Sequence, residues 1–481
     1  MNENEKNFVA ELREEEKDGK KTPKKEKKDD TQEVYAKKFR DGTRIEALYD
    51  ATEEKTKLAI SQGGKTSTAE KWKSEKDVFT APSLPNGLLE GKTIKLPSAL
   101  EDFENDEELF QEIKSFIHKY LEVSEEFENM ASWYVMFTWV YDAFQEVPYL
   151  RAIGDYGTGK SRFLKTIGSL CYRPVFLNGS TSVSAVFRII DMAKGTLAFD
   201  EADFSRSDTT SEIIKILNAG FQTETPVLRA EERKGKKGRM YDPQSYNVFG
   251  PKILATRKEF ADAALESRCL TYSMQERTRK DIPSNLNEDF EEEALAIRNK
   301  LLAFRFYKFS QGISLQKLPD EIDIESRLRQ IITPLYSVVE GEGKKKVLEF
   351  IQAKQKSCAE ERFNSQEGEF LRSFLEVKKG EPEPTIKDIV EYYNENFAGK
   401  YSIKPRRAGV IIETFHFQKQ RKSQGVVILN NEHNEEQIQR LKKQYGLLQP
   451  SMNNMNDVNI TENPATLEDF QEIFGSDEST S

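Results

Sequence analysis

One stretch of eight residues, 154–161, restricts the fold of this chain more than any other feature. It reads Gly-Asp-Tyr-Gly-Thr-Gly-Lys-Ser and fits the pattern G-x-x-x-x-G-K-[S/T]. A strand-like run at 149–153 precedes it, and a helix-like run at 161–167 follows it. Glycines let backbone N–H groups face a phosphate chain, and the start of a helix favours an anion. The sequence therefore predicts a nucleoside triphosphate site on an α/β P-loop core, a parallel sheet with helices on both faces.

The residues of this loop have separate expected roles. Lys160 reaches the outer phosphates as a point charge, and the Ser161 hydroxyl ligates Mg²⁺. A chance glycine-rich turn is the alternative, and the strand–loop–helix context argues against it. The residues expected to hold ATP are Gly154, Asp155, Tyr156, Gly157, Thr158, Gly159, Lys160, Ser161 and Arg162.

A second motif follows at 195–201, where Gly-Thr-Leu-Ala-Phe-Asp-Glu predicts a buried strand that ends in two acids. We expect Asp200 to hold Mg²⁺ through water, and Glu201 to orient and deprotonate the attacking water. An acidic strand end is weak evidence alone, but its place after the loop fits alternating βα units. Asp203 completes the string Asp-Glu-Ala-Asp, but the other motifs of that helicase class are not evident. We interpret that match as coincidence.

A third apolar run, at 249–256, ends in a polar residue. Thr256, or alternatively Arg257, is expected near the γ-phosphate as a sensor. The sequence then passes through a helix-like run at 258–265 to Ser-Arg-Cys at 267–269.

In this order the motifs resemble those of the AAA+ ATPases, and the Ser-Arg-Cys sequence at 267–269 resembles the SRC box of clamp loaders. The resemblance implies that Arg268 is an arginine finger that reaches the nucleotide of a neighbouring subunit in a homo-oligomeric ring. A surface arginine in a salt bridge is the alternative. Residues 100–275 also resemble the ATPase module of helicase-like replication proteins from phages, plasmids and integrated elements. The sequence departs from these families in lacking a clear second sensor, for which Arg327 and Arg329 are candidates.

Residues 226–241 predict a β-hairpin with a tip of glycine, lysine and arginine. In a ring ATPase such a hairpin can point into the central channel and grip nucleic-acid phosphates. An exposed loop whose charges only keep it soluble is the alternative. The expected contacts are Lys234, Lys236, Lys237 and Arg239.

The last region predicts two helices and a basic hairpin after a Glu-Pro-Glu-Pro linker at 381–384. This order resembles a winged helix, in which the second helix approaches a DNA groove and the wing contacts the backbone. Winged helices also bind proteins, so DNA contact is one of two interpretations. The expected DNA contacts are Arg406, Arg407, Arg421 and Lys422.

Composition limits the remaining possibilities. With 72 basic and 82 acidic residues the formal charge is −10, so bulk charge does not indicate a nucleic-acid binder and local patches must do so. Three scattered cysteines without a CxxC pair favour a reducing cytoplasm over a disulfide or zinc framework. We find no signal peptide, and no apolar run approaches the ~20 residues of a membrane helix.

The expected domains follow from these segments. They are a disordered charged tail (1–34), a small β-rich module (35–99), a helical lead-in (100–147), the P-loop core (148–278), a helical lid (285–378), a winged helix (382–446) and an acidic flexible tail (447–481) that offers a replication protein a short docking helix.

Together these features favour an ATP-hydrolysing motor on single-stranded or forked DNA, a helicase or translocase in the replication of a mobile element. The alternatives are an ATP-switched DNA-binding loader or regulator without unwinding activity, and a protein-remodelling ATPase.

Overall fold

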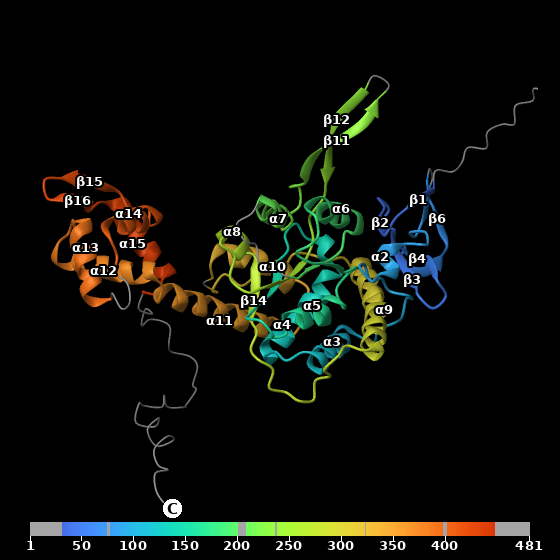
Figure 1. Ribbon diagram of the computed structural model, residues 1–481. Helices are drawn as coiled ribbons and strands as arrows, with labels where there is room; N and C mark the ends of the chain where they lie inside the picture. Colours follow the sequence, from blue (N-terminus) through green and yellow to red (C-terminus); the bar gives the residue numbers. More distant parts are fainter. Residues whose placement is uncertain are drawn as a thin grey trace, which may run out of the picture. The chain divides into compact units, whose positions relative to one another are not determined.

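A computed structural model gives the fold of the chain (Figure 1). It separates into two compact units, Met1–Ile351 and Gln352–Ser481. The side chains of 208–210, 233–235 and 238–240 are outside the description. The structure describes residues 31–74, 77–200, 208–235, 238–322, 324–397 and 402–447.

A parallel sheet forms the centre of the first unit. Among the described residues, its five strands are ordered β14-β8-β13-β10-β9, and all neighbouring pairs are parallel. The strands are largely apolar and buried, as expected for a parallel sheet covered by helices on both faces. The prediction of an α/β core with a parallel sheet is therefore confirmed. The strands are β8 (Tyr149–Ile153), β9 (Val175–Leu177), β10 (Leu197–Phe199), β13 (Lys252–Thr256) and β14 (Cys269–Ser273).

The order of the strands separates β8, which leads into the glycine-rich loop, from β10, which ends just before Asp200. Strand β13 lies between them, because Ile253 is level with Leu150 of β8 and with Ala198 of β10. The carboxyl ends of these parallel strands meet at one edge of the sheet. We call this edge the loop edge, and the edge formed by the amino ends of the strands the entry edge.

Helices cover the sheet and begin where the sequence offers a cap. The side chains of Asn105 and Ser124 accept hydrogen bonds from the backbone N–H groups of Glu108 and Phe127, so α3 and α4 start there. Helix α5 contacts β8, β10 and β13, and α6 contacts β9. The helices of this layer are α3 (Asp106–Tyr120), α4 (Glu125–Thr138), α5 (Lys160–Gly168), α6 (Val183–Ala193) and α7 (Asp208–Ala219), with the short η1 (Tyr141–Ala143).

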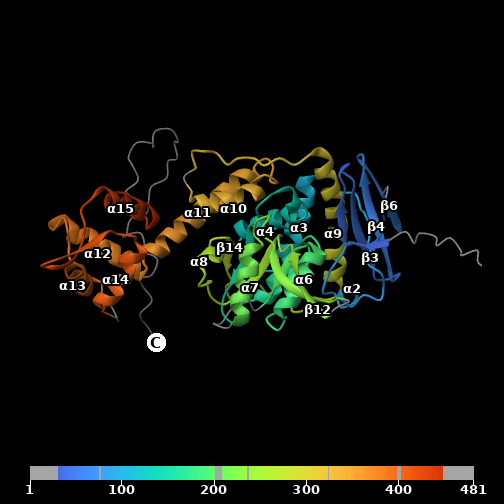
Figure 2. The same ribbon diagram turned by 90° about the horizontal axis from the view of Figure 1, so that it is seen from above.

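The N-terminal strands make two small sheets, ordered β1-β7-β6 and β2-β3-β4-β5. Figures 1 and 2 show these strands beside helix α9. A buried ion pair joins the two, since the Arg305 Nε of α9 lies 2.8 Å from the Glu46 Oε1 of β3. The bounds are β1 (Thr31–Glu33), β2 (Ala36–Lys38), β3 (Arg44–Asp50), β4 (Lys55–Gln62), β5 (Lys65–Ala69), β6 (Lys71–Lys73), β7 (Val78–Thr80) and α9 (Glu288–Gln311).

A long hairpin projects from the first unit (Figure 1). Strands β11 (Val227–Gly235) and β12 (Gly238–Tyr246) pair along their whole length, which confirms the predicted hairpin. The remaining helices of this unit are α2 (Gly87–Glu90), α8 (Ala263–Glu266) and α10 (Ser326–Tyr336).

The second unit is built from helices and a short hairpin. Helix α12 packs against α13, and its Phe370, Leu371 and Phe374 join the core of this unit. The sequence predicts a lid that continues to residue 378, whereas α12 belongs to the second unit. The apolar face of a helix does not indicate which domain will cover it, so the sequence could not place this limit. The elements are α12 (Gln366–Gly380), α13 (Ile386–Asn396), α14 (Pro405–Thr414), β15 (Lys419–Lys422), β16 (Gly425–Ile428) and α15 (Glu432–Gln444), and α11 (Gly343–Phe363) crosses the limit between the units.

Candidate nucleotide-binding site

The glycine-rich loop leaves β8 at the loop edge and enters α5. Gly157 has a φ of 81° and Gly159, the N-cap of α5, a φ of 92°. Both values lie in the left-handed region that glycine adopts without strain. A Cβ on Gly154 would lie 2.7 Å from the Thr158 Oγ1 and 3.1 Å from the Met274 carbonyl oxygen. The loop therefore needs glycine at these positions, and its compact turn suits a cradle for phosphates.

Lys160 folds back over this loop. Its Nζ donates to the Gly154 carbonyl at 2.7 Å and to the Asp155 carbonyl at 2.6 Å. The Thr158 hydroxyl donates to the same Asp155 carbonyl at 2.9 Å. The ammonium group is thus held at the loop, on the first turn of α5, next to the exposed Ser161.

Two arginines near the loop have other partners. Arg162 donates to the carbonyl oxygens of Tyr120 and Ser284, at 3.3 and 2.5 Å, and so ties α5 to neighbouring segments. Tyr156 is 77% exposed, and the Arg257 guanidinium lies 4.1 Å from the centre of its ring. Arg257 is therefore beside the loop, as its sequence position predicts.

The acidic strand end lies at the loop edge. Asp200 directly follows β10, and its N–H donates to the Leu177 carbonyl of β9 at 2.9 Å. Glu201 and Asp203 lie outside the described residues. Neighbouring strands are ~4.8 Å apart, so β8 and β10, with β13 between them, are separated by ~10 Å at this edge.

Thr256 ends the strand between them. Its carbonyl accepts a hydrogen bond from the Gly154 N–H at 3.2 Å, which joins β13 to the start of the loop. The residue is 1% exposed, and its Oγ1 is buried with no hydrogen-bond partner among the described residues. An unpaired buried hydroxyl is rare, because nearly all such groups are satisfied in folded proteins. The fold thus brings the loop, Asp200 and an unpaired donor together.

Arg268 lies at the entry edge. Its carbonyl accepts from the Tyr149 N–H at 2.9 Å, at the amino end of β8. The side chain is 8% exposed, donates to the Asn218 Oδ1 of α7 and lies 4.3 Å from the centre of the Phe221 ring. Burial lowers the pKa of its guanidinium. The side chain is therefore buried, whereas the alternative considered for it is a surface arginine in a salt bridge.

The lid candidates also lie away from the loop or have other partners. Arg327 is 5.4 Å from the Phe221 ring, close to Arg268 at the entry edge. Arg329 donates to three backbone carbonyls, those of Leu318, Pro319 and Ile322. Arg327 therefore lies at the opposite edge from the loop of its own chain, and the guanidinium of Arg329 is held by backbone carbonyls. The spacing of residues along a helix does not reveal which edge of the sheet they will approach.

A buried ion pair that the sequence analysis misses supports the turn before Arg268. Arg151, which is 0% exposed in the middle of β8, donates to both carboxylate oxygens of Glu266 and to the Thr271 hydroxyl. Glu266 also accepts from the Phe260 N–H at 2.9 Å. The sequence offers one signal for this ion pair, an arginine within an otherwise apolar strand. A buried charge is kept only where it has partners, so such an arginine indicates an acidic partner nearby.

A second such charge, Lys252, lies at the foot of the hairpin. It begins β13, is 1% exposed and donates to the carbonyl oxygens of Gly220, Val248 and Gly250, at 3.0, 3.1 and 2.7 Å. Burial lowers the pKa of Lys252 to about 7. These bonds fix the end of α7 and the return from the hairpin to the entry edge of the sheet.

The expected nucleic-acid contacts in the hairpin are only partly described. Lys236 and Lys237 lie outside the described residues, as do the side chains of Lys234 and Arg239, whose backbones face each other across the hairpin. On β12, Tyr241 is described and is 65% exposed.

In the second unit, two of the four expected contacts are paired with acids. Arg407 lies 2.8 Å from the Glu367 carboxylate, and Lys422 is paired with Glu383. Arg406, in the first turn of α14, and Arg421, on β15, are exposed.

Comparisons with known proteins give no family assignment. No family model and no curated protein matches the chain. Among solved structures, the apo A form of the NrS-1 C-terminal region aligns with 80% of this chain and 96% of that chain, at 13% identity and a TM-score of 0.34. JCV helicase aligns with 54% of this chain and 63% of that chain, at 10% identity and a TM-score of 0.26. Likenesses at these TM-scores carry no functional argument.

The described residues hold neither a cluster of metal ligands nor a membrane-spanning helix. In that part of the chain, no group of three or more His, Cys, Asp or Glu side chains could hold a metal ion. A magnesium ion here would need phosphate and water oxygens in addition to protein ligands, as is usual for Mg²⁺. In the same residues, none of the helices has the length and apolarity needed to cross a membrane.

Proposed function

We propose that this chain is an ATP-hydrolysing motor of the AAA+ type that acts on DNA. The observation that carries the proposal is the convergence at the loop edge of the glycine-rich loop, the acidic end of β10 and the unpaired Thr256 hydroxyl. Any one of these features could occur in a protein that binds no nucleotide. Together they match what triphosphate hydrolysis needs: a phosphate cradle, a carboxylate and a donor beside them.

The proposed roles follow from these positions. Lys160 exchanges its loop carbonyls for the outer phosphates, and Ser161 and Asp200 hold Mg²⁺, which would supply charge neutralisation for the phosphates. Glu201 orients and deprotonates the attacking water. Thr256 donates its hydroxyl to the γ-phosphate or to that water, which would satisfy the unpaired group.

Arg268 is proposed to act on the site of a neighbouring subunit. It lies at the entry edge, across the sheet from the loop of its own chain, so it cannot serve that loop. A head-to-tail ring would bring this edge to the loop edge of the next subunit. Arg268 would then exchange Asn218 and the Phe221 ring for the transition-state charge.

DNA binding is proposed for the projecting hairpin and for the second unit. The hairpin sequence places Lys234, Lys236, Lys237 and Arg239 around its tip, a density of charge that suits a phosphate backbone. In the second unit, the helix–helix–hairpin order of α13, α14 and β15–β16 supports a winged helix, with Arg406 and Arg421 exposed for contact.

The decisive test is the rate of ATP hydrolysis with and without single-stranded and forked DNA, over a range of protein concentrations and with Lys160→Ala as the blank. A motor with shared sites predicts DNA stimulation that rises cooperatively with protein concentration, together with strand displacement on the fork. A slow rate that ignores DNA would refute the motor and favour an ATP-switched loader or regulator.

A further inference from the structure

A cavity of about 510 Å³ lies at the entry edge of the sheet. Strands β2 and β3, the η1 turn and helix α9 form part of its lining. The rest comes from the chain segments just before β9, β10 and β13, which enter the sheet at this edge. The cavity is therefore separated from the glycine-rich loop by the length of the strands. Its size is in the range of small-ligand sites.

Among the residues that the structure describes, the lining is strongly basic, with six cationic side chains against two carboxylates. The acids are Glu46 and Asp142, and both are already engaged. Arg305 donates to Glu46 at 2.8 Å and to Asp142 at 2.7 and 3.0 Å. Arg44 donates to Asp142 at 2.9 Å. The cations are Lys37, Lys38, Arg44, Arg173, Lys194 and Arg305.

Arg173 is the third buried arginine of this lining and lacks a full set of partners. It is 4% exposed, and its Nε has no hydrogen-bond acceptor among the described residues. The Glu46 carboxylate is 3.8 Å away, beyond hydrogen-bond distance, and accepts instead from the Tyr172 hydroxyl at 2.8 Å. The Nη1 and Nη2 atoms of Arg173 donate to neutral oxygens, those of Ala193, Lys194 and the Tyr172 hydroxyl. Among the described residues of the lining, two carboxylates thus face three buried guanidinium groups, so one positive charge lacks a carboxylate of its own and the Arg173 Nε remains as a donor for an anion.

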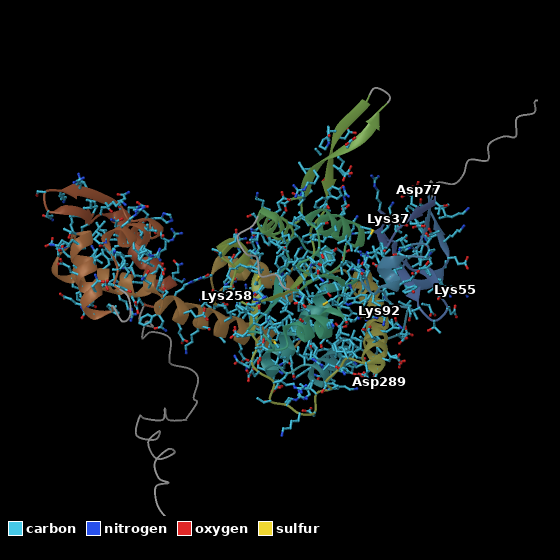
Figure 3. The ribbon with its side chains drawn as sticks, in the orientation of Figure 1. Lys37, Lys55, Asp77, Lys92, Lys258 and Asp289 are labelled. Atoms are coloured by element: carbon cyan, nitrogen blue, oxygen red, sulfur yellow. The ribbon has the colours of Figure 1, made fainter. Side chains whose placement is uncertain are left out.

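The open side of the cavity adds three lysines. Lys38 and Lys194 are exposed, and Lys37 is half-buried with its Nζ 4.1 Å from the centre of the Phe79 ring. Figure 3 labels Lys37 on the side of the N-terminal strands that faces the core. In the described part of the chain none of the three forms an ion pair. Aromatic rings complete the lining, which is a surface that suits both phosphates and bases: Tyr141, Phe144, Tyr172 and Phe249.

The cavity lies next to the feet of the projecting hairpin. Thr223 lines it just before β11, and Asn247 and Phe249 line it just after β12. A strand of nucleic acid that runs along the hairpin from its tip to its feet would reach this basic lining.

We propose that the entry-edge cavity is a second anion site, which binds a phosphate group of a nucleotide unit. The position beside the hairpin favours a phosphate of a single-stranded nucleic acid as the ligand, and a free mononucleotide offers the same chemistry. The site does not depend on ATP hydrolysis at the loop edge. Only the choice of the strand as phosphate source rests on the proposed function.

The test compares two triple variants with the same change of charge. The cavity variant is Lys37→Ala, Lys38→Ala and Lys194→Ala. The control is Lys55→Ala, Lys65→Ala and Lys71→Ala, whose lysines are exposed on β4, β5 and β6 and do not line the cavity. Each is measured by fluorescence anisotropy with a short single-stranded DNA over a range of salt. Binding of AMP is measured in the Lys160→Ala background, so that the glycine-rich loop does not contribute.

The cavity variant should bind the oligonucleotide at least ~10-fold more weakly than the control, with a salt dependence reduced by ~0.7 for each phosphate that its lysines no longer neutralise. That result without AMP binding supports the strand as ligand. If the chain binds AMP and the cavity variant does not, the result supports a free nucleotide as ligand, even if the wild-type chain does not bind DNA. Equal oligonucleotide affinities of the two variants, without AMP binding at the cavity, would overturn the proposal. If the cavity variant misfolds, the single variant Lys194→Glu, at an exposed position, replaces it in the same binding measurements and should show the same weakening.

Discussion

Replacing Thr256 by valine removes one hydroxyl group from the loop edge without changing the shape of the side chain. A buried hydroxyl without a partner costs about 1–3 kcal/mol, so Thr256→Val should raise the free energy of unfolding by ~1 kcal/mol. If that hydroxyl binds the γ-phosphate or the attacking water, its loss removes about 1.5–3 kcal/mol of transition-state stabilisation. The value of kcat should then fall roughly 10- to 150-fold. The variant is expected to be more stable and much slower.

Thr271→Val is the matched control on the same sheet. Thr271 lies on β14, the other neighbour of β8, and its hydroxyl accepts from the Arg151 Nε and Nη2 at 3.1 and 2.9 Å. Removing this acceptor leaves donors of a buried guanidinium unpaired, which costs about 1–3 kcal/mol. The same chemical change should therefore stabilise the chain at Thr256 and destabilise it at Thr271.

The assay combines urea unfolding without nucleotide and phosphate release at saturating ATP. The reasoning predicts opposite signs for the two changes in unfolding free energy, and loss of kcat for Thr256→Val without loss of ATP affinity. A Thr256→Val chain that unfolds more easily than wild type would show that the hydroxyl has a structural partner. A kcat within about twofold of wild type would show that it does not contact the reacting groups.

Four further outcomes test the remaining features. Lys160→Ala should abolish ATP binding in equilibrium dialysis, because it removes the ammonium of the loop, and equal affinities would refute the site. Glu201→Gln should bind ATP but hydrolyse it at least ~100-fold more slowly in single turnovers, whereas normal turnover would exclude it as the base. Arg268→Ala should lose ~10³-fold in turnover. Part of the turnover should return when it is mixed with Lys160→Ala, because a mixed interface pairs an intact loop with an intact arginine. No return of activity would show that another residue is the arginine finger. Between pH 7 and about pH 10 the unfolded chain binds more protons at Lys252 than the folded chain, so stability should rise by up to ~1.4 kcal/mol per pH unit. Lys252→Met should remove that rise in urea unfolding, and an unchanged slope would contradict the lowered pKa of Lys252.

The sequence predicts the local features of this fold well, because they depend on neighbouring residues. Glycines that need positive φ mark the loop at 157 and 159, and apolar runs mark β8, β10 and β13. The pairing of strands is not local, so the place of β13 between β8 and β10 could not be inferred from the patterns.

The environment of single side chains is harder to predict. Arg268 is placed by its motif, but its burial against Asn218 and Phe221 depends on a helix far from it in the sequence. Arg151 and Lys252 stand out as charges in apolar strands, but the partners that satisfy them come from other segments. The entry-edge cavity combines segments from the N-terminal strands to α9, which no pattern of spacing connects.

The two ends of β13 give this strand a mechanical role. Thr256 lies at the loop edge. Lys252, ~13 Å away along the strand, donates hydrogen bonds to the segments on either side of the hairpin. Both flanks of β13 are hydrogen-bonded to parallel strands, which resists bending between its two ends. If loss of a phosphate displaced Thr256, that displacement would be transmitted along β13 to the base of the hairpin. Nucleotide state and hairpin position would be linked directly, with no hinge between them.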